Sequence, residues 1–174
     1  MQNLFMYFVV FLKIAVPALM LKFPFAGLWG NYFLDVVDGD ILRFLGMPEF
    51  TYQSIDKVCD LVSYFFMLGL GMRLKVRKLI IVLFFYRLIG QILFFVTRNE
   101  AVFFYFQNLL EPFLMIYTLL WLVKKDEGLA FATYKKHVFI VWAIVIAYKV
   151  WNEWYLHIAN IDLSTIFFGF NGGS

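Results

Sequence analysis

Five of the seven aspartates in this 174-residue chain fall within one short stretch, residues 35–60. Asp35 and Asp38 are three residues apart and Asp56 and Asp60 are four apart, so each pair shares one face of a helix. Carboxylates without His or Cys partners form a hard-oxygen ligand set, which suits Mg²⁺ or Mn²⁺ and also Ca²⁺. Residue types and spacing therefore predict a divalent-metal site formed by these four aspartates.

The four aspartates lie within otherwise apolar runs, which makes their charge expensive. One Asp at the centre of a membrane helix costs about 2.5–3.5 kcal/mol, so four unpaired ones cost on the order of 10 kcal/mol. They need a compensating positive charge, and one divalent cation supplies it. A buried polar network without metal is the alternative.

The elements that carry these residues are predicted to be membrane helices. The chain is 63% hydrophobic and only 16% charged, whereas soluble domains are about 45–50% apolar and 25% charged. Six apolar segments have about the 20 residues that a membrane span needs. They are 4–22, 25–45, 52–72, 79–97, 102–123 and 138–158. We expect an all-α integral membrane protein, a bundle of about six transmembrane helices in one domain (1–171), with 172–174 as a cloning scar.

The basic residues predict an orientation for this bundle. Cytoplasmic loops carry an excess of Lys and Arg. Loops on one face hold nine basic residues: Lys22, four within 73–78 and four within 124–136. Loops on the other face hold Arg43 and Arg98. Loops 73–78 and 124–136 are therefore predicted to be cytoplasmic, and the acidic site to open on the opposite side. Short basic clusters between apolar runs also argue against nucleic acid as a partner.

The acidic stretch resembles the signature of the CDP-alcohol phosphatidyltransferases. That signature is Asp-x2-Asp-Gly-x2-Ala-Arg, then eight residues, then Gly-x3-Asp-x3-Asp. Six of its eight specified positions match without a gap: Asp35, Asp38, Gly39, Arg43, Asp56 and Asp60. Two positions depart, with Leu42 in place of Ala and Tyr52 in place of the second Gly.

The resemblance implies a six-helix membrane enzyme of phospholipid synthesis that depends on Mg²⁺ or Mn²⁺. It implies that Asp35, Asp38 and Asp56 hold the metal. Asp60 would complete the metal site and act as general base, deprotonating an alcohol that attacks the β-phosphorus of a CDP-linked donor and releases CMP. Gly39 would leave room for the nucleotide and Arg43 would pair with a phosphate. Tyr52 places a phenol ring where the family keeps open space.

Other functions stay open at this stage. In the family the signature faces the cytoplasm, whereas the charge pattern here places it outside. A cation channel or carrier that uses the acidic cluster is the main alternative, and a non-catalytic member of the fold is another. Expected partners are membrane lipids and a CDP-linked lipid or alcohol, and homo-oligomerisation is left open.

A second intramembrane polar group is predicted deeper in the bundle. Arg87 and Glu111 lie near the middle of the fourth and fifth predicted helices, with Gln91 and Asn108 one turn away. Intramembrane charges usually pair with each other, so we expect an interhelical ion pair; a substrate or proton site is the alternative. Pro112 is predicted to kink the fifth helix.

Overall fold

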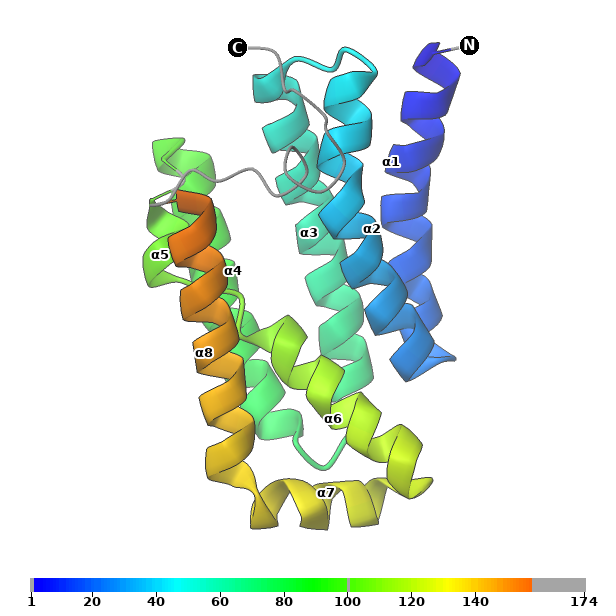
Figure 1. Ribbon diagram of the computed structural model, residues 1–174, viewed down its shortest axis with the longest axis vertical. Coiled ribbons are helices and arrows are strands. Elements are labelled where there is room, and N and C mark those ends of the chain that lie inside the picture. The colour runs from blue at the N-terminus through cyan, green and yellow to red at the C-terminus, as the bar shows by residue number, and fades with distance from the viewer. Residues whose placement is uncertain (1, 100, 158–174) are drawn as a thin grey trace.

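The computed structural model describes residues 2–99 and 101–157, which are all-helical and contain no strand (Figure 1). The elements are α1 (Gln2–Ala18), a 3₁₀ turn η1 (Leu19–Leu21), α2 (Pro24–Phe44), α3 (Glu49–Gly71), α4 (Arg77–Thr97), α5 (Val102–Tyr105), α6 (Leu110–Lys124), α7 (Glu127–Lys136) and α8 (Val138–His157). The end of the predicted single domain and residues 172–174 lie outside the described part.

Fewer helices are long and apolar enough to cross a membrane than the six predicted. Among the described residues two qualify, in the segments Leu4–Leu21 and Arg77–Thr97. A third span results if α7 and the adjoining part of α8, which are bent by 82°, count as one.

Charge and length explain the difference. Every 18-residue stretch of α2 or α3 contains at least three charged side chains, because the aspartates lie there. Helix α6 has 15 residues, which at 1.5 Å per residue give about 22 Å, short of a hydrocarbon core of about 30 Å.

The fifth predicted helix is the main correction to the predicted segments. Instead of one helix over 102–123, the chain forms the short α5, leaves helical geometry at Phe106, and begins again with α6. Proline lacks an N–H and is best tolerated in the first turn of a helix. Because α6 begins at Leu110, Pro112 falls in that first turn. The predicted kink is therefore a complete break.

Residues 127–136, predicted to be part of a loop, form α7. Asp126 caps this helix, since its side chain accepts a hydrogen bond from Leu129 N at 2.7 Å. Lys135 and Lys136 lie in the last turn, where positive charge favours a helix. In Figure 1, α7 lies across the lower end of the bundle, nearly perpendicular to α8.

The helices form two groups (Figure 1). Helices α1, α2 and α3 pack on one another, whereas α4, α5 and α8 lie on the other side and α6 crosses between the groups in the lower half. The main apolar core lies in that lower half, where the Phe113 ring stacks on Trp142 at 5.6 Å between centroids and meets Tyr134 edge-on. The acidic stretch lies in the α1–α3 group, away from this core.

The three basic loops lie at the same end of the bundle, as the alternation of the predicted helices requires. Arg73 Nη1 donates to Leu21 O at 2.9 Å and joins the first two loops. Lys75 N donates to Glu127 Oε1 at 2.9 Å and joins the second loop to α7. The turn between α2 and α3 lies at the opposite end (Figure 1).

Candidate functional site

The α2–α3 pair brings three of the four predicted aspartates together, and Asp60 lies outside that group. A short turn at Gly46, whose φ is +84°, reverses the chain between the two helices. Asp38 and Asp56 are each about seven residues from that turn, so they reach the same depth, about 10 Å below it. Ligand oxygens of Asp35, Asp38 and Asp56 lie within 4.8 Å of one another. The predicted convergence of carboxylates from two antiparallel helices is therefore present.

A lysine from a third helix occupies the centre of this cluster. Lys13 Nζ lies 2.6 Å from Asp38 Oδ2, 2.5 Å from Asp56 Oδ1 and 3.2 Å from Asp35 Oδ1. Lys13, Asp38 and Asp56 are buried, whereas the Asp35 side chain is 41% exposed. An ammonium group has three N–H donors and no acceptor; Lys13 donates to Asp38 and Asp56 and forms an ion pair with Asp35. The chain thus supplies one counter-ion of its own.

A second lysine, Lys57, lies beside Asp56 and Asp60. Lys57 Nζ contacts Asp56 Oδ2 at 2.6 Å and lies 3.8 Å from Asp60 Oδ2. Four carboxylates and two ammonium groups leave a formal charge of −2 on Asp35, Asp38, Asp56, Asp60 and their lysines. One divalent cation has the charge that neutralises this remainder.

The donor chemistry fits a hard divalent cation. All ligand candidates are carboxylate oxygens, which Mg²⁺ and Mn²⁺ prefer. Asp38 is fully buried, and its Oδ1 has no hydrogen-bond partner among the described residues. A buried carboxylate oxygen without a partner is costly, and a cation bound there would satisfy it. Asp35, Asp38 and Asp56 could hold the metal, with Asp60 beside them.

The space next to Gly39 is filled by the tyrosine that departs from the family signature. A Cβ added at Gly39 would lie 2.7 Å from Tyr52 Oη and 3.2 Å from Tyr52 Cζ. The Arg43 guanidinium lies over the Tyr52 ring, 4.9 Å from its centroid. The two residues that the resemblance assigns to nucleotide and phosphate are therefore both in contact with the Tyr52 side chain.

The Arg87 and Glu111 side chains are both buried, and the ion pair between them stays a prediction. The Glu111 carboxylate accepts hydrogen bonds from Asn31 Nδ2 at 3.1 Å and Asn108 Nδ2 at 3.2 Å. Arg87 donates from Nε to Tyr64 Oη at 3.1 Å and from Nη1 to Phe106 O at 2.8 Å.

The break in the fifth predicted helix explains part of this hydrogen bonding. It exposes the Phe106 carbonyl to Arg87, and it places Glu111 in the first turn of α6. There Asn108 Oδ1 also accepts from Glu111 N, at 3.3 Å. Both charged groups thus find partners that a continuous helix would not have offered.

Sequence reasoning missed Lys13 and the polar chain beside the cluster. Lys13 is the one charged residue within the apolar run 4–20, which is a signal for a buried partner. Ser63 Oγ donates to Asn31 Oδ1 at 2.9 Å, and Asn31 donates to Glu111. Asn31 lies one helical turn from Asp35, and Ser63 one turn from Asp60, so polar groups continue from the cluster towards α6.

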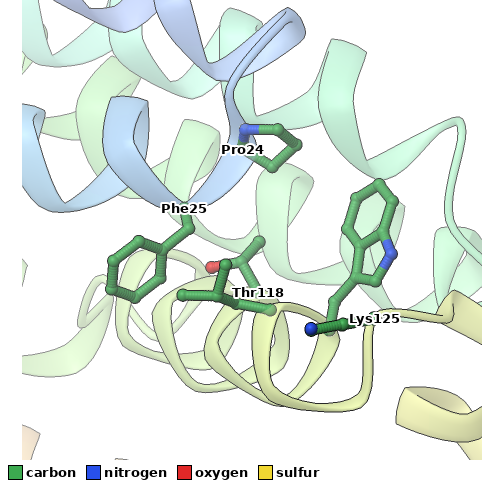
Figure 2. A pocket seen from close by; sticks show the side chains of 6 residues that line it. Pro24, Phe25, Thr118 and Lys125 are labelled. Carbon is green, nitrogen blue, oxygen red and sulfur yellow. The ribbon is translucent and has the colours of Figure 1, made fainter.

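A separate pocket lies at the basic end of the bundle and takes no part in this site. It has a volume of about 260 Å³ and lies between the start of α2 and the end of α6. Figure 2 shows Pro24 and Phe25 on the α2 side and Thr118 and Lys125 on the α6 side. Fourteen residues of α2 separate Pro24 from Asp38, about 21 Å along the helix axis.

Comparisons with known proteins add no assignment to this geometry. No protein-family model, no curated protein and no solved structure matches the chain.

Proposed function

We propose that this chain is a multi-pass membrane protein whose acidic cluster binds Mg²⁺ or Mn²⁺ and transfers a phosphoalcohol group from a CDP-linked lipid to an alcohol. The observation that carries the proposal is the convergence of Asp35, Asp38 and Asp56 with a formal charge of −2 on the whole cluster. The unpartnered Asp38 Oδ1 supports it, since a metal would complete that oxygen's coordination.

The roles of the side chains follow from their positions. Asp35, Asp38 and Asp56 would hold the cation, which when bound would screen the pyrophosphate charge of the donor. Asp60, beside the cluster and 3.8 Å from Lys57 Nζ, would take the proton of the attacking hydroxyl. The alcohol oxygen then bonds to the β-phosphorus, the bond from that phosphorus to CMP breaks, and CMP leaves.

Tyr52 limits this activity in our proposal. Its hydroxyl fills the space above Gly39, where the resemblance places the nucleotide. Replacing Tyr52 by glycine restores the family residue and opens that space. We therefore expect Tyr52→Gly to release CMP faster than the wild type.

A CMP-release assay on purified protein in lipid nanodiscs tests the enzyme. The reaction contains CDP-diacylglycerol, Mg²⁺ or Mn²⁺ and a panel of polar alcohols. Asp60→Asn should abolish release while Mn²⁺ binding, measured by electron paramagnetic resonance, persists. Asp40→Asn is the matched control, because Asp40 lies on the same helix as Asp38 but outside the ion-paired cluster. If neither the wild type nor folded Tyr52→Gly releases CMP with any alcohol, the transferase proposal fails.

The membrane arrangement is part of the same proposal. Helices α2 and α3 would span the bilayer because Lys13 and Lys57 pair with their aspartates, which lowers the cost of burying the charges. The end with the basic loops would face the cytoplasm. Single cysteines at Thr51 and Lys78, both exposed and at opposite ends, can be labelled in a Cys59→Ser background. If the cysteine at position 51 is labelled only from the cytoplasm, the orientation is the opposite of the one proposed here.

A cation carrier is the second candidate, and the polar chain next to the cluster favours it. Ser63, Asn31 and Glu111 extend hydrogen bonding from the cluster towards α6. Buried polar chains of this kind mark ion and proton paths in membrane proteins. Manganese or proton flux into liposomes without any nucleotide, lost in Glu111→Leu, would favour the carrier. The same protein should then release no CMP.

A further inference from the structure

We propose that Lys13 is a tethered counter-ion that a divalent cation must displace, so that α1 sets the affinity of the acidic site for metal. This inference rests on the metal site proposed above and concerns how that site is occupied. It assigns a role to a helix that lies outside the aspartate signature.

The first step is that the ammonium group and a metal ion compete for one place. Lys13 Nζ lies 2.5–3.2 Å from oxygens of Asp35, Asp38 and Asp56. Those three residues also form the candidate ligand set, with ligand oxygens within 4.8 Å of one another. Mg²⁺ binds oxygen at about 2.0–2.1 Å, so an ion bound by the same oxygens would overlap the Lys13 nitrogen. Occupation by one excludes the other.

The second step concerns what the ammonium leaves unsatisfied. The ammonium donates hydrogen bonds to Asp38 Oδ2 and Asp56 Oδ1 and lies in ion-pair contact with Asp35 Oδ1. Asp38 Oδ1, on a fully buried residue, remains without a partner among the described residues. A six-coordinate cation can accept more oxygens than three N–H groups can serve. The cluster is therefore held by Lys13 but not completed by it.

The third step is the route by which Lys13 leaves. Its contact with Asp35 is the longest of the three, and Asp35 is the exposed member of the cluster. The ammonium can keep that outer contact while it releases Asp38 and Asp56. The lysine then stays near Asp35, on the exposed side of the cluster, while the cation binds the two buried carboxylates.

Displacement weakens metal binding by a factor that depends on how often Lys13 leaves the cluster. When the binding-competent state is a fraction of the population, the apparent Kd is the intrinsic Kd divided by that fraction. A competent fraction of about one tenth makes the wild type bind about tenfold more weakly than a chain without the ammonium, equivalent to about 1.4 kcal/mol.

Mn²⁺ binding measured by electron paramagnetic resonance on the full chain in nanodiscs tests the proposal. Lys13→Met should bind Mn²⁺ at least about tenfold more tightly than the wild type, and Mn²⁺ should raise its Tm more than that of the wild type. Lys149→Met is the control, because Lys149 is also buried but lies outside the cluster; its Mn²⁺ affinity should equal that of the wild type.

A charge-balanced pair keeps the test decisive if Lys13→Met does not fold. Asp35→Asn and the double variant Lys13→Met with Asp35→Asn differ only in the ammonium, and the double variant has the wild-type cluster charge. The double variant should bind Mn²⁺ at least about tenfold more tightly than Asp35→Asn alone.

The outcomes separate this inference from the enzyme proposal. Equal Mn²⁺ affinity with and without Lys13 overturns the displacement and leaves the metal site standing. Binding by Lys13→Met but not by the wild type supports displacement and refutes a metal-dependent transferase in the native chain. No Mn²⁺ binding by any folded variant overturns both proposals.

Discussion

The contact between Gly39 and Tyr52 permits a quantitative test of the site geometry. In Gly39→Ala the new methyl carbon would lie 2.7 Å from Tyr52 Oη, too close for any real contact, so the tyrosine must move. Overpacking of this kind costs about 1–3 kcal/mol, whereas Gly→Ala inside a helix gains up to about 1 kcal/mol. We expect Gly39→Ala to lower the free energy of unfolding by about 1–2 kcal/mol.

Removing the hydroxyl should relieve this loss. In Tyr52→Phe the nearest atom to the added methyl becomes the ring carbon at 3.2 Å, which needs a shift of only a few tenths of an ångström. The double-mutant cycle should therefore give a coupling energy of about 1 kcal/mol or more. Gly30→Ala is the matched control on the same helix, because its Cβ would meet only Val16 Cγ1 at 3.4 Å; it should not lose stability.

The assay is reversible unfolding of the four proteins in mixed micelles with increasing SDS, followed by tryptophan fluorescence. A coupling energy below about 0.5 kcal/mol is what independent sites give. That result would show that the Tyr52 hydroxyl does not lie against Gly39. The obstruction proposed for the nucleotide would then be refuted, and Tyr52→Gly would have no reason to speed CMP release.

Three further predictions concern contacts between helices. Gly27→Ala should lower the free energy of unfolding by about 3 kcal/mol or more, since its Cβ would lie 2.4 Å from the backbone of η1; a Tm equal to that of Gly30→Ala would contradict this. Glu127→Ala removes an acceptor shared by α6 and the α3–α4 loop, so it should lower stability by about 1–3 kcal/mol and speed amide hydrogen exchange in α7, whereas unchanged exchange would refute the tether. Glu111→Leu leaves two buried asparagine amides unpaired and should cost about 1–3 kcal/mol more than Glu111→Gln; equal unfolding midpoints would contradict that network.

Much of the helical layout could be predicted from the sequence, because apolar runs and their interruptions determine it. Pro24 and Pro48 mark the starts of α2 and α3, as prolines at helix beginnings do. The break before α6 could not be predicted with the same ease, since hydropathy alone does not distinguish a kink at Pro112 from a restart two residues earlier. Helix α7 was missed because it is short and only weakly apolar, although its Asp126 cap was visible.

For the site, too, local features could be predicted from the sequence and long-range contacts could not. The spacing of Asp35, Asp38, Asp56 and Asp60 sufficed to predict which faces they share, because that is a property of each helix. The partner of the cluster was not predictable from spacing, since Lys13 is 25 residues from Asp38 and 43 from Asp56. Such a contact depends on how α1 docks against the α2–α3 pair. The hydrogen-bond partners of Arg87 and Glu111 were missed for the related reason that a local break changed the surroundings of both side chains; the ion pair between them stays a prediction.

The position of Lys13 on the first helix has a consequence for biosynthesis. The segment Leu4–Leu21 is long and apolar enough to cross a membrane, and it carries the counter-ion for the two helices that follow. Helices α2 and α3, whose aspartates pair with Lys13 in the folded chain, follow it in the order of synthesis. The first 71 residues therefore contain every charge of the cluster, so they can neutralise one another before α4 is synthesised. Order of synthesis and order of charge compensation coincide in this chain.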